Sequence, residues 1–181
     1  MLILKITRFR DIPQFTRDGS WQADYDLPSF VHAIEDFVKN HGLQLNPDFQ
    51  RGHIWSEDQQ IKWLEFLLKG GRTSRIIYLN KPDWNLKVED GDYNEFVCVD
   101  GLQRTTAIFN FIKGKIPVFG SYFYEYEDKI RFSVGSIKIN INDLKTQKEV
   151  LQWYVDMNAG GTPHTNEEIE RVKKMILDLE K

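Results

Sequence analysis

Residues 100–106, which read Asp-Gly-Leu-Gln-Arg-Thr-Thr, are the chain's clearest candidates for chemistry. They follow the apolar run at residues 96–99 and lead into apolar residues at helical spacing, so we expect a strand to end and a helix to begin here. The first N–H groups of a helix carry a partial positive charge and bind anions, phosphate above all. The sequence therefore predicts a phosphate-binding turn between this strand and this helix.

Four residues of the turn have types that suit phosphate binding. Gly101 has no side chain, so a ligand can approach the backbone. Arg104 offers a forked donor that matches phosphate oxygens, and Thr105 and Thr106 add hydroxyl groups. We interpret these residues as phosphate-binding.

Asp100 and Gln103 are candidates for the reaction itself. A carboxylate beside a phosphate can hold a divalent cation or polarise a water, and an amide can orient the same water. A simpler interpretation has Asp100 as the N-cap of the helix and Arg104 as its surface partner, because short Asp-Gly turns are common. The pattern by itself leaves both interpretations open.

Two further polar segments lie beside expected helices. Residues 46–55 lead into a helix that Ser56 caps, and Gln50 and Arg51 are their candidate ligand contacts. Residues 157–165 carry a double glycine before another helix. Taken singly, each segment is also explained as an ordinary loop or a helix connection.

In this order and spacing the three segments resemble the ParB/sulfiredoxin-like family whose members carry Asp-Gly-Gln-Gln-Arg. Such domains form the N-terminal, nucleotide-binding half of GmrSD-type modification-dependent restriction enzymes. The family's Pro-x-x-Gln-Arg element with a following Trp matches residues 47–55, and its Asn-x-Gly element before a Glu-rich helix matches residues 157–168. Its Asp-Gly-Gln-Gln-Arg motif matches residues 100–104, with Leu102 in place of the first Gln. The resemblance spans residues 27–170.

The resemblance implies binding of an NTP with Mg²⁺, and in many members hydrolysis of the β–γ bond. The implied reactive centre is Asp100, Gln103 and Arg104, with Asp100 as the metal ligand. The implied nucleotide contacts are Gln50, Arg51, Gly101, Thr105, Thr106, Asn158 and Gly160. Partners implied by the family are DNA or a restriction or phage-defence protein.

Three functions remain open at this point. The first is a metal-dependent NTP hydrolase. The second is a non-hydrolytic module that senses or binds a nucleotide or DNA. This function applies if the replacement of the first motif Gln by Leu102 abolishes hydrolysis. The third is a DNA nicking enzyme, since some ParB-like proteins are credited with nuclease activity.

Composition sets the wider frame. The 181 residues are 41% hydrophobic and 28% charged, which is typical of a folded domain rather than a disordered chain. The net charge of −3 gives no overall basic field for DNA or a membrane. Cys98 is the single cysteine, so no intramolecular disulfide can form, and its apolar neighbours predict burial. No apolar stretch is long enough to span a membrane, and we expect a cytoplasmic protein without a membrane partner.

The elements that must position these residues can be read from caps and periodicity. Asp26 can cap a helix over residues 28–40 that Gly42 ends, and Ser56 with Gln59 can form a capping box for a second helix. Further helices are expected at 101–113 and at two C-terminal stretches, whose capping boxes pair Thr146 with Glu149 and Thr165 with Glu168. Strands are expected at residues 2–6, 75–79, 96–99, 122–126, 130–134 and 137–141, the last three as a meander, with an irregular stretch over the twenty residues that follow residue 6. We therefore predict one α+β domain over residues 1–181, with a small mixed sheet, surrounding helices and C-terminal helices. The resemblance implies that this domain has a ParB/sulfiredoxin-like fold.

Overall fold

Four strands in the described part of the chain form one mixed sheet. The computed structural model describes residues 6–8, 12, 21–50, 52–84, 93–159 and 166–179. The strands are β1 (Trp21–Asp26), β2 (Ile76–Asn80), β3 (Val97–Asp100) and β4 (Ser136–Asn142). Their order across the sheet is β1-β4-β2-β3. β4 pairs antiparallel with β1 and parallel with β2, while β2 pairs antiparallel with β3.

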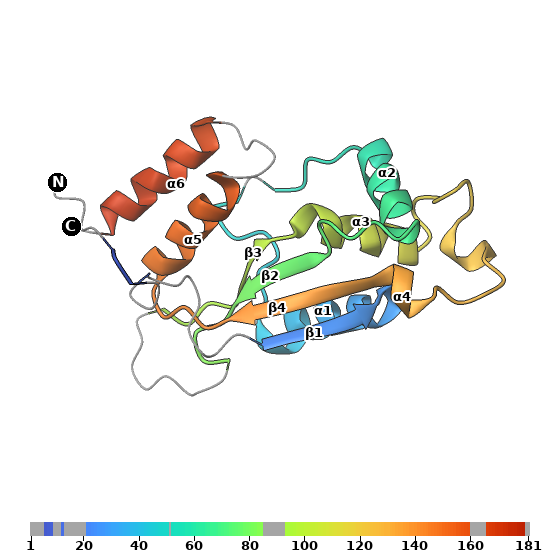
Figure 1. The fold of residues 1–181 in the computed structure, drawn as a ribbon, viewed down its shortest axis with the longest axis horizontal. Coiled ribbons are helices and arrows are strands. Elements are labelled where there is room, and N and C mark those ends of the chain that lie inside the picture. Colours follow the sequence, from blue (N-terminus) through green and yellow to red (C-terminus); the bar gives the residue numbers. More distant parts are fainter. Residues whose placement is uncertain are drawn as a thin grey trace.

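Helices cover both faces of this sheet. They are α1 (Leu27–His41), α2 (Glu57–Leu68), α3 (Leu102–Ile112), α4 (Phe132–Gly135), α5 (Gln147–Ala159) and α6 (Asn166–Asp178), with a 3₁₀ turn η2 (Phe123–Glu125). Figure 1 shows α5 and α6 together at one end of the molecule, and α4 with the segment that follows α3 at the other end. This arrangement confirms the expected α+β class with a small mixed sheet.

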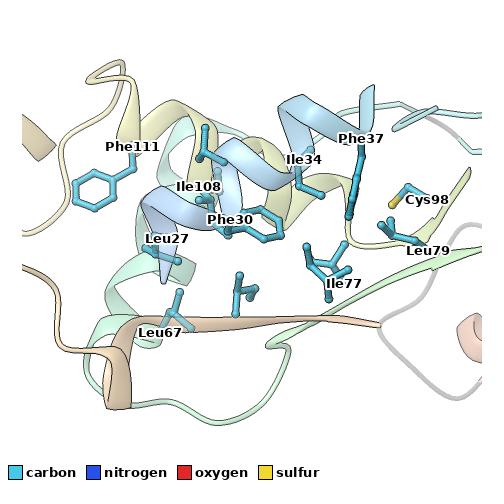
Figure 2. Packing of buried hydrophobic residues seen from close by; sticks show 14 of the residues in the cluster. Leu27, Phe30, Ile34, Phe37, Leu67, Ile77, Leu79, Cys98, Ile108 and Phe111 are labelled. Carbon is cyan, nitrogen blue, oxygen red and sulfur yellow. The ribbon is translucent and has the colours of Figure 1, made fainter. Parts of the chain in front are cut away.

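The main core fills the space between the sheet and helices α1, α2 and α3. Ile77 and Leu79 of β2 and the buried isoleucines of β4 point to this side, because alternate residues of a strand face the same way. Figure 2 shows Ile77 and Leu79 of β2 on the side of the sheet that faces Ile34 and Phe37 of α1. Cys98 of β3 also lies here, fully buried, as its apolar neighbours predict.

A second cluster lies on the opposite face, under α5 and α6. Val97 and Val99 of β3 contribute to it, and the ring of Tyr78 packs edge-on against Trp153 of α5 at 5.7 Å between centroids. Val172 and Ile176 of α6 complete the cluster on the side away from the sheet. β3 is therefore packed on both faces, and its C-terminal end is held rigidly.

The helix signals in the sequence are confirmed where the structure describes them. The Asp26 side chain accepts the N–H of Ser29 at 2.8 Å, and Gly42 ends α1 in the left-handed conformation. Ser56 and Gln59 form the expected capping box of α2. The expected strand at residues 2–6, apart from Ile6, and the cap at Thr165 lie outside the described residues.

The pair Thr146 and Glu149 also forms its expected capping box, at the start of α5. The Thr146 hydroxyl accepts the N–H of Glu149 at 3.2 Å, and the Glu149 carboxylate accepts the N–H of Thr146 at 3.0 Å. This box fixes where α5 begins, and α5 carries two residues of the site described below.

Three expectations about strands were wrong. Residues 122–126 contain η2, because the N–H of Tyr122 bonds the Glu125 carboxylate at 2.7 Å and the aromatic rings pack on Phe111 rather than on the sheet. Residues 130–134 lead into α4, where the carbonyl of Arg131 accepts two N–H groups of a helical turn. No meander forms, since β4 runs between β1 and β2.

The stretch expected to be irregular contains β1. Trp21, Ala23 and Tyr25 alternate with more polar residues and pair with Ile141, Ile139 and Ile137 of β4. This two-residue period was present in the sequence, where Gln22, Asp24 and Asp26 alternate with the inward-facing residues. In the part of the chain that the structure describes, no helix is long and apolar enough to cross a membrane.

Candidate functional site

Three segments that are far apart in the sequence line one pocket, which we call the polar pocket. Its lining residues are Gln50, Gly52, Val99, Asp100, Gly101, Leu102, Gln103, Tyr154 and Asn158. They come from the loop before α2, from the β3–α3 turn and from α5. The cavity volume is about 70 Å³, well below that of a pocket for a whole drug-sized ligand. Its size suits a single small polar group.

The N-terminus of α3 opens onto this pocket without a side-chain cap. Gly101 is the N-cap residue, and no side chain bonds the first turn from that position. The first helical hydrogen bond runs from the N–H of Thr105 to the carbonyl of Gly101 at 2.9 Å. The N–H groups of Gln103 and Arg104 precede it and have no intrahelical acceptor, which makes this helix end electropositive.

Gly101 is required here for a reason that the sequence did not reveal. Its φ is +131°, a conformation that side chains rarely adopt, and a Cβ would lie 2.6 Å from Cδ1 of Ile77. The turn is therefore pressed against β2 in the main core. Glycine at this position sets the distance between strand and helix as well as leaving the backbone open.

Asp100 and Arg104 form an ion pair at the edge of the pocket. Nη2 of Arg104 lies 2.7 Å from Oδ2 of Asp100. The Arg104 side chain is 11% exposed and that of Asp100 is 41% exposed, so the guanidinium is the buried partner and the carboxylate faces the pocket. Asp100 is not the N-cap, since Gly101 holds that position, and Arg104 is not a surface residue. Arg104 itself is absent from the lining of the polar pocket.

Gln103 joins α3 to the loop before α2. Its Oε1 accepts the N–H groups of Ile54 at 2.9 Å and Trp55 at 3.1 Å, and its Nε2 donates to the carbonyl of Gly52 at 2.8 Å. Both ends of the amide are therefore engaged by backbone groups. The geometry gives Gln103 a positioning role at the pocket wall.

Gln50 holds the end of β3 in the same way. Its Nε2 donates to the carbonyls of Cys98 at 2.5 Å and Val99 at 3.1 Å, directly before Asp100. The loop that carries Gln50 is fixed in turn by Arg171 of α6, whose guanidinium donates to the carbonyls of residues 48–50 at 2.9 to 3.4 Å. The position of α6 is thus linked to the pocket through backbone carbonyls.

The two threonines of the motif point away from the pocket. Thr105 is 1% exposed and its hydroxyl has no hydrogen-bond partner in the described part of the chain. The hydroxyl of Thr106 donates to the carbonyl of Leu102 at 2.9 Å, one helical turn back. Neither hydroxyl lines the polar pocket.

Asn158 and Tyr154 supply the wall from α5. Nδ2 of Asn158 donates to the carbonyl of Tyr154 at 2.7 Å, which fixes the amide over the pocket. The structure thus brings Gln50, Asp100, Gln103 and Asn158, which come from the three polar segments singled out in the sequence, to one pocket. Arg51 and Gly160 lie outside the described residues.

Cys98 directly precedes the lining residues of β3 and is not a reactive thiol. Burial raises the pKa of its thiol to about 12, and the nearby Asp100 carboxylate adds to this shift. The thiol therefore stays protonated at neutral pH and acts as a packing group.

Metal binding has one candidate ligand in the described lining. No group of three or more His, Cys, Asp or Glu residues within the described ranges is arranged to hold an ion. Asp100 is the single carboxylate among the lining residues. Mg²⁺ is commonly held by one or two carboxylates together with substrate phosphates, so this donor set fits an ion that arrives with a nucleotide.

Sequence reasoning missed two residues of the site. Arg171 and Tyr154 lie on helices, and their types and spacing carry no motif. Tyr154 was detectable only as part of the apolar face of α5, whose buried neighbours include Leu151 and Val155. Arg171 makes its contacts through its guanidinium to backbone carbonyls, which no local pattern predicts.

A mixed α+β domain with a small polar pocket at an uncapped helix N-terminus is the class of protein that these observations define. The family model that matches this chain is the GmrSD restriction endonuclease, N-terminal domain, over residues 34–133, more than half of the chain. The chain belongs to this family, as its motifs predicted, and the family's function is restriction-related. No curated protein and no solved structure matches the chain significantly, so the likeness to ParB and sulfiredoxin folds stays a prediction.

Proposed function

We propose that this domain binds the phosphates of a nucleoside triphosphate at the polar pocket and hydrolyses the terminal phosphate with Mg²⁺. The observation that supports this most directly is the convergence of Gln50, residues 99–103 and Asn158 on the open N-terminus of α3. A cavity of about 70 Å³ suits one phosphate group rather than a whole nucleotide. The base and sugar would then lie outside this cavity.

Each lining residue has a distinct part in the proposal. The N–H groups at the start of α3 bind phosphate oxygens, and the amide of Asn158 donates to the same group. Asp100 would hold Mg²⁺, and the bound ion would neutralise charge on the phosphates. Gln50 and Gln103 fix the walls through backbone groups and contact the ligand only at its edge.

Arg104 acts on the ligand through Asp100. Its buried guanidinium balances the carboxylate, which would otherwise repel a triphosphate. In hydrolysis a water attacks the terminal phosphorus, the bond to the bridging oxygen breaks, and a nucleoside diphosphate, inorganic phosphate and one proton are released. That proton passes to bulk solvent, because the carboxylate of Asp100 is already engaged by Arg104 and, in this proposal, by Mg²⁺.

A second candidate is a nucleotide-binding module without turnover. It is favoured by Gln103, whose amide is already bonded at both ends and so is not available to orient a water. The two candidates share the same ligand and the same pocket. They differ only in whether phosphate is released.

Calorimetric titration with each NTP and Mg²⁺, followed by a phosphate-release assay, tests both candidates. Arg104→Ala should weaken nucleotide binding by about 1–4 kcal/mol, the scale of repulsion between the unbalanced Asp100 carboxylate and a nearby phosphate charge. Asp100→Asn should keep nucleotide binding and lose turnover. Asp58→Asn, which removes an exposed carboxylate on α2, is the matched control.

Different results separate the alternatives. Binding without release in the unaltered protein supports the non-hydrolytic module. Turnover at the parental rate in Asp100→Asn removes Asp100 from the chemistry, and absence of any NTP binding removes the proposal. Thermal unfolding of Arg104→Lys alongside Arg104→Ala separates loss of binding from loss of folding.

A further inference from the structure

A second cavity lies at the opposite end of α3 and is much larger than the polar pocket. Its volume is about 590 Å³, within the range of ligand sites. We call it the aromatic groove, and its lining residues are Asp26, Pro28, Phe123, Tyr124, Tyr126, Asp128, Lys129, Ile130 and Phe132. Neither the family match nor the polar pocket involves it in any assigned role.

The rings of the groove are fixed from behind. Phe123 and Tyr126 pack edge-on against the buried ring of Phe111, with centroids 5.4 Å and 6.0 Å away, and the Tyr126 hydroxyl donates to the carbonyl of Val118 at 2.6 Å. Tyr124 lies parallel to Tyr122, with centroids 5.6 Å apart and 2° between the ring planes. The groove is therefore preformed, and a ligand loses little freedom in ordering its walls.

The outer faces of the same rings are open to solvent. Tyr124 is 73% exposed, Phe132 is 53% exposed and Tyr126 is 37% exposed. Exposed aromatic side chains gathered around a concave surface mark an interaction site, since scattered ones are normal but clustered ones are not. This face offers ring surface that nothing in the described chain covers.

The acidic residues around the groove indicate that its ligand is cationic. The groove and the segment that forms it carry the carboxylates of Asp26, Glu125, Glu127 and Asp128 against the cations of Lys129 and Arg131. Asp128 lines the groove, and no described residue pairs with its carboxylate. Aromatic faces attract cations, and carboxylates at the rim add to that attraction while repelling a phosphodiester backbone.

We propose that the aromatic groove binds a basic segment of a partner protein, with an Arg or Lys side chain over the rings and its charge at Asp128. The volume accommodates several residues rather than one cationic group. A contact of this kind occurs elsewhere in the described chain, since Nζ of Lys69 lies 5.2 Å from the ring centroid of Phe119, which does not line the groove. The groove and the polar pocket then act on different ligands.

A fluorescently labelled hexa-arginine peptide at physiological salt is the probe, and anisotropy reports its binding to the intact chain. Tyr124→Ala should weaken binding about tenfold, because one cation–π contact is lost. Asp128→Asn should weaken it several-fold, and the remaining affinity should depend less on salt. Phe66→Ala and Asp58→Asn remove an exposed ring and an exposed carboxylate of α2, outside the groove, and should leave binding unchanged.

Several results overturn the proposal. They are no binding of the peptide by the unaltered protein, equal losses in the control variants, and tighter binding of a labelled hexa-glutamate or oligo-dT strand than of hexa-arginine. Self-association that Tyr124→Ala abolishes, measured by sedimentation, assigns the groove to a second copy of this chain instead. Circular dichroism of each variant confirms that it is folded, so each affinity can be interpreted.

Discussion

The polar pocket and the aromatic groove lie at the two ends of helix α3 and are built in opposite ways. The pocket joins segments far apart in the chain through side-chain amides and a guanidinium bonded to backbone carbonyls. The groove is lined almost entirely by residues 123–132. Aromatic rings of this segment pack against Phe111 in the last turn of the helix. The pocket's shape depends on the whole fold, whereas the groove's shape depends on one segment and its anchor.

Glycine substitutions near the pocket and near the groove should differ most in their effect on the free energy of unfolding. Gly101→Ala places a Cβ 2.6 Å from Ile77 in a conformation with φ of +131°. We expect a loss of roughly 2–4 kcal/mol in the free energy of unfolding, from backbone strain and overpacking together. Urea denaturation measures this loss.

Gly120→Ala is the matched control near the groove. Gly120 also has positive φ, +80°, but a Cβ there meets nothing within 4 Å. Only the strain of about 1–2 kcal/mol is expected. Equal losses in the two variants would show that the packing of the β3–α3 turn against β2 adds nothing.

Arg171→Ala should weaken the pocket and leave the groove intact. It removes the guanidinium that holds the carbonyls of Asp48, Phe49 and Gln50. Because this guanidinium is partly solvated, we expect a moderate loss of about 1 kcal/mol in nucleotide affinity. Titration with NTP and with hexa-arginine on the same variant measures both sites.

Lys173→Ala, on the same helix with an exposed pair to Glu170, controls for a general effect on α6. It should change neither affinity. If Arg171→Ala also reduces peptide binding at the groove, the two regions are coupled and the comparison between them fails.

Alkaline pH should destabilise the strand beneath the pocket. Burial raises the pKa of Cys98 to about 12 in the folded chain, from 9.0 for the ordinary thiol. The protonated thiol is favoured by folding, so its stabilising contribution is complete below pH 9 and is lost as the pH rises toward about 12. Between pH 9 and about pH 10 this amounts to at most about 1 kcal/mol.

The slope of unfolding free energy against pH measures the effect, with Cys98→Ala as the comparison. That variant loses packing at every pH but should show a shallower decline above pH 9. Identical slopes would mean that other groups account for the alkaline loss.

The sequence predicted those parts of the molecule that local interactions determine. The caps at Asp26 and Ser56, the β3–α3 turn and the pair Thr146 and Glu149 each act within a few residues, so their pattern is visible in the chain. Three polar segments were expected to share one site, and lining residues from all three do meet at the pocket.

Long-range contacts explain what the sequence did not predict. The alternating aromatics of residues 122–126 suit a strand locally, but Phe111 draws their rings to the end of α3. Gln103 was expected to orient a water by its type, and its bonds to the backbone of Gly52, Ile54 and Trp55, about fifty residues away, left no local signal. A polar side chain near a site can bind the ligand or the protein, and only the tertiary fold distinguishes these uses.

The position of β4 in the sheet has a consequence for how the chain folds during synthesis. β4 is the last strand in the described part of the chain but lies between β1 and β2, and Trp21 pairs with Ile141. Until residues 136–142 leave the ribosome, β1 and β2 have no neighbour on their facing edges and the isoleucines that complete the core are missing. Such unpaired edges invite association with other chains, and pairings this distant in sequence form slowly. Nascent chains stalled before β4 should therefore be recognised by chaperones, and release should follow once β4 inserts.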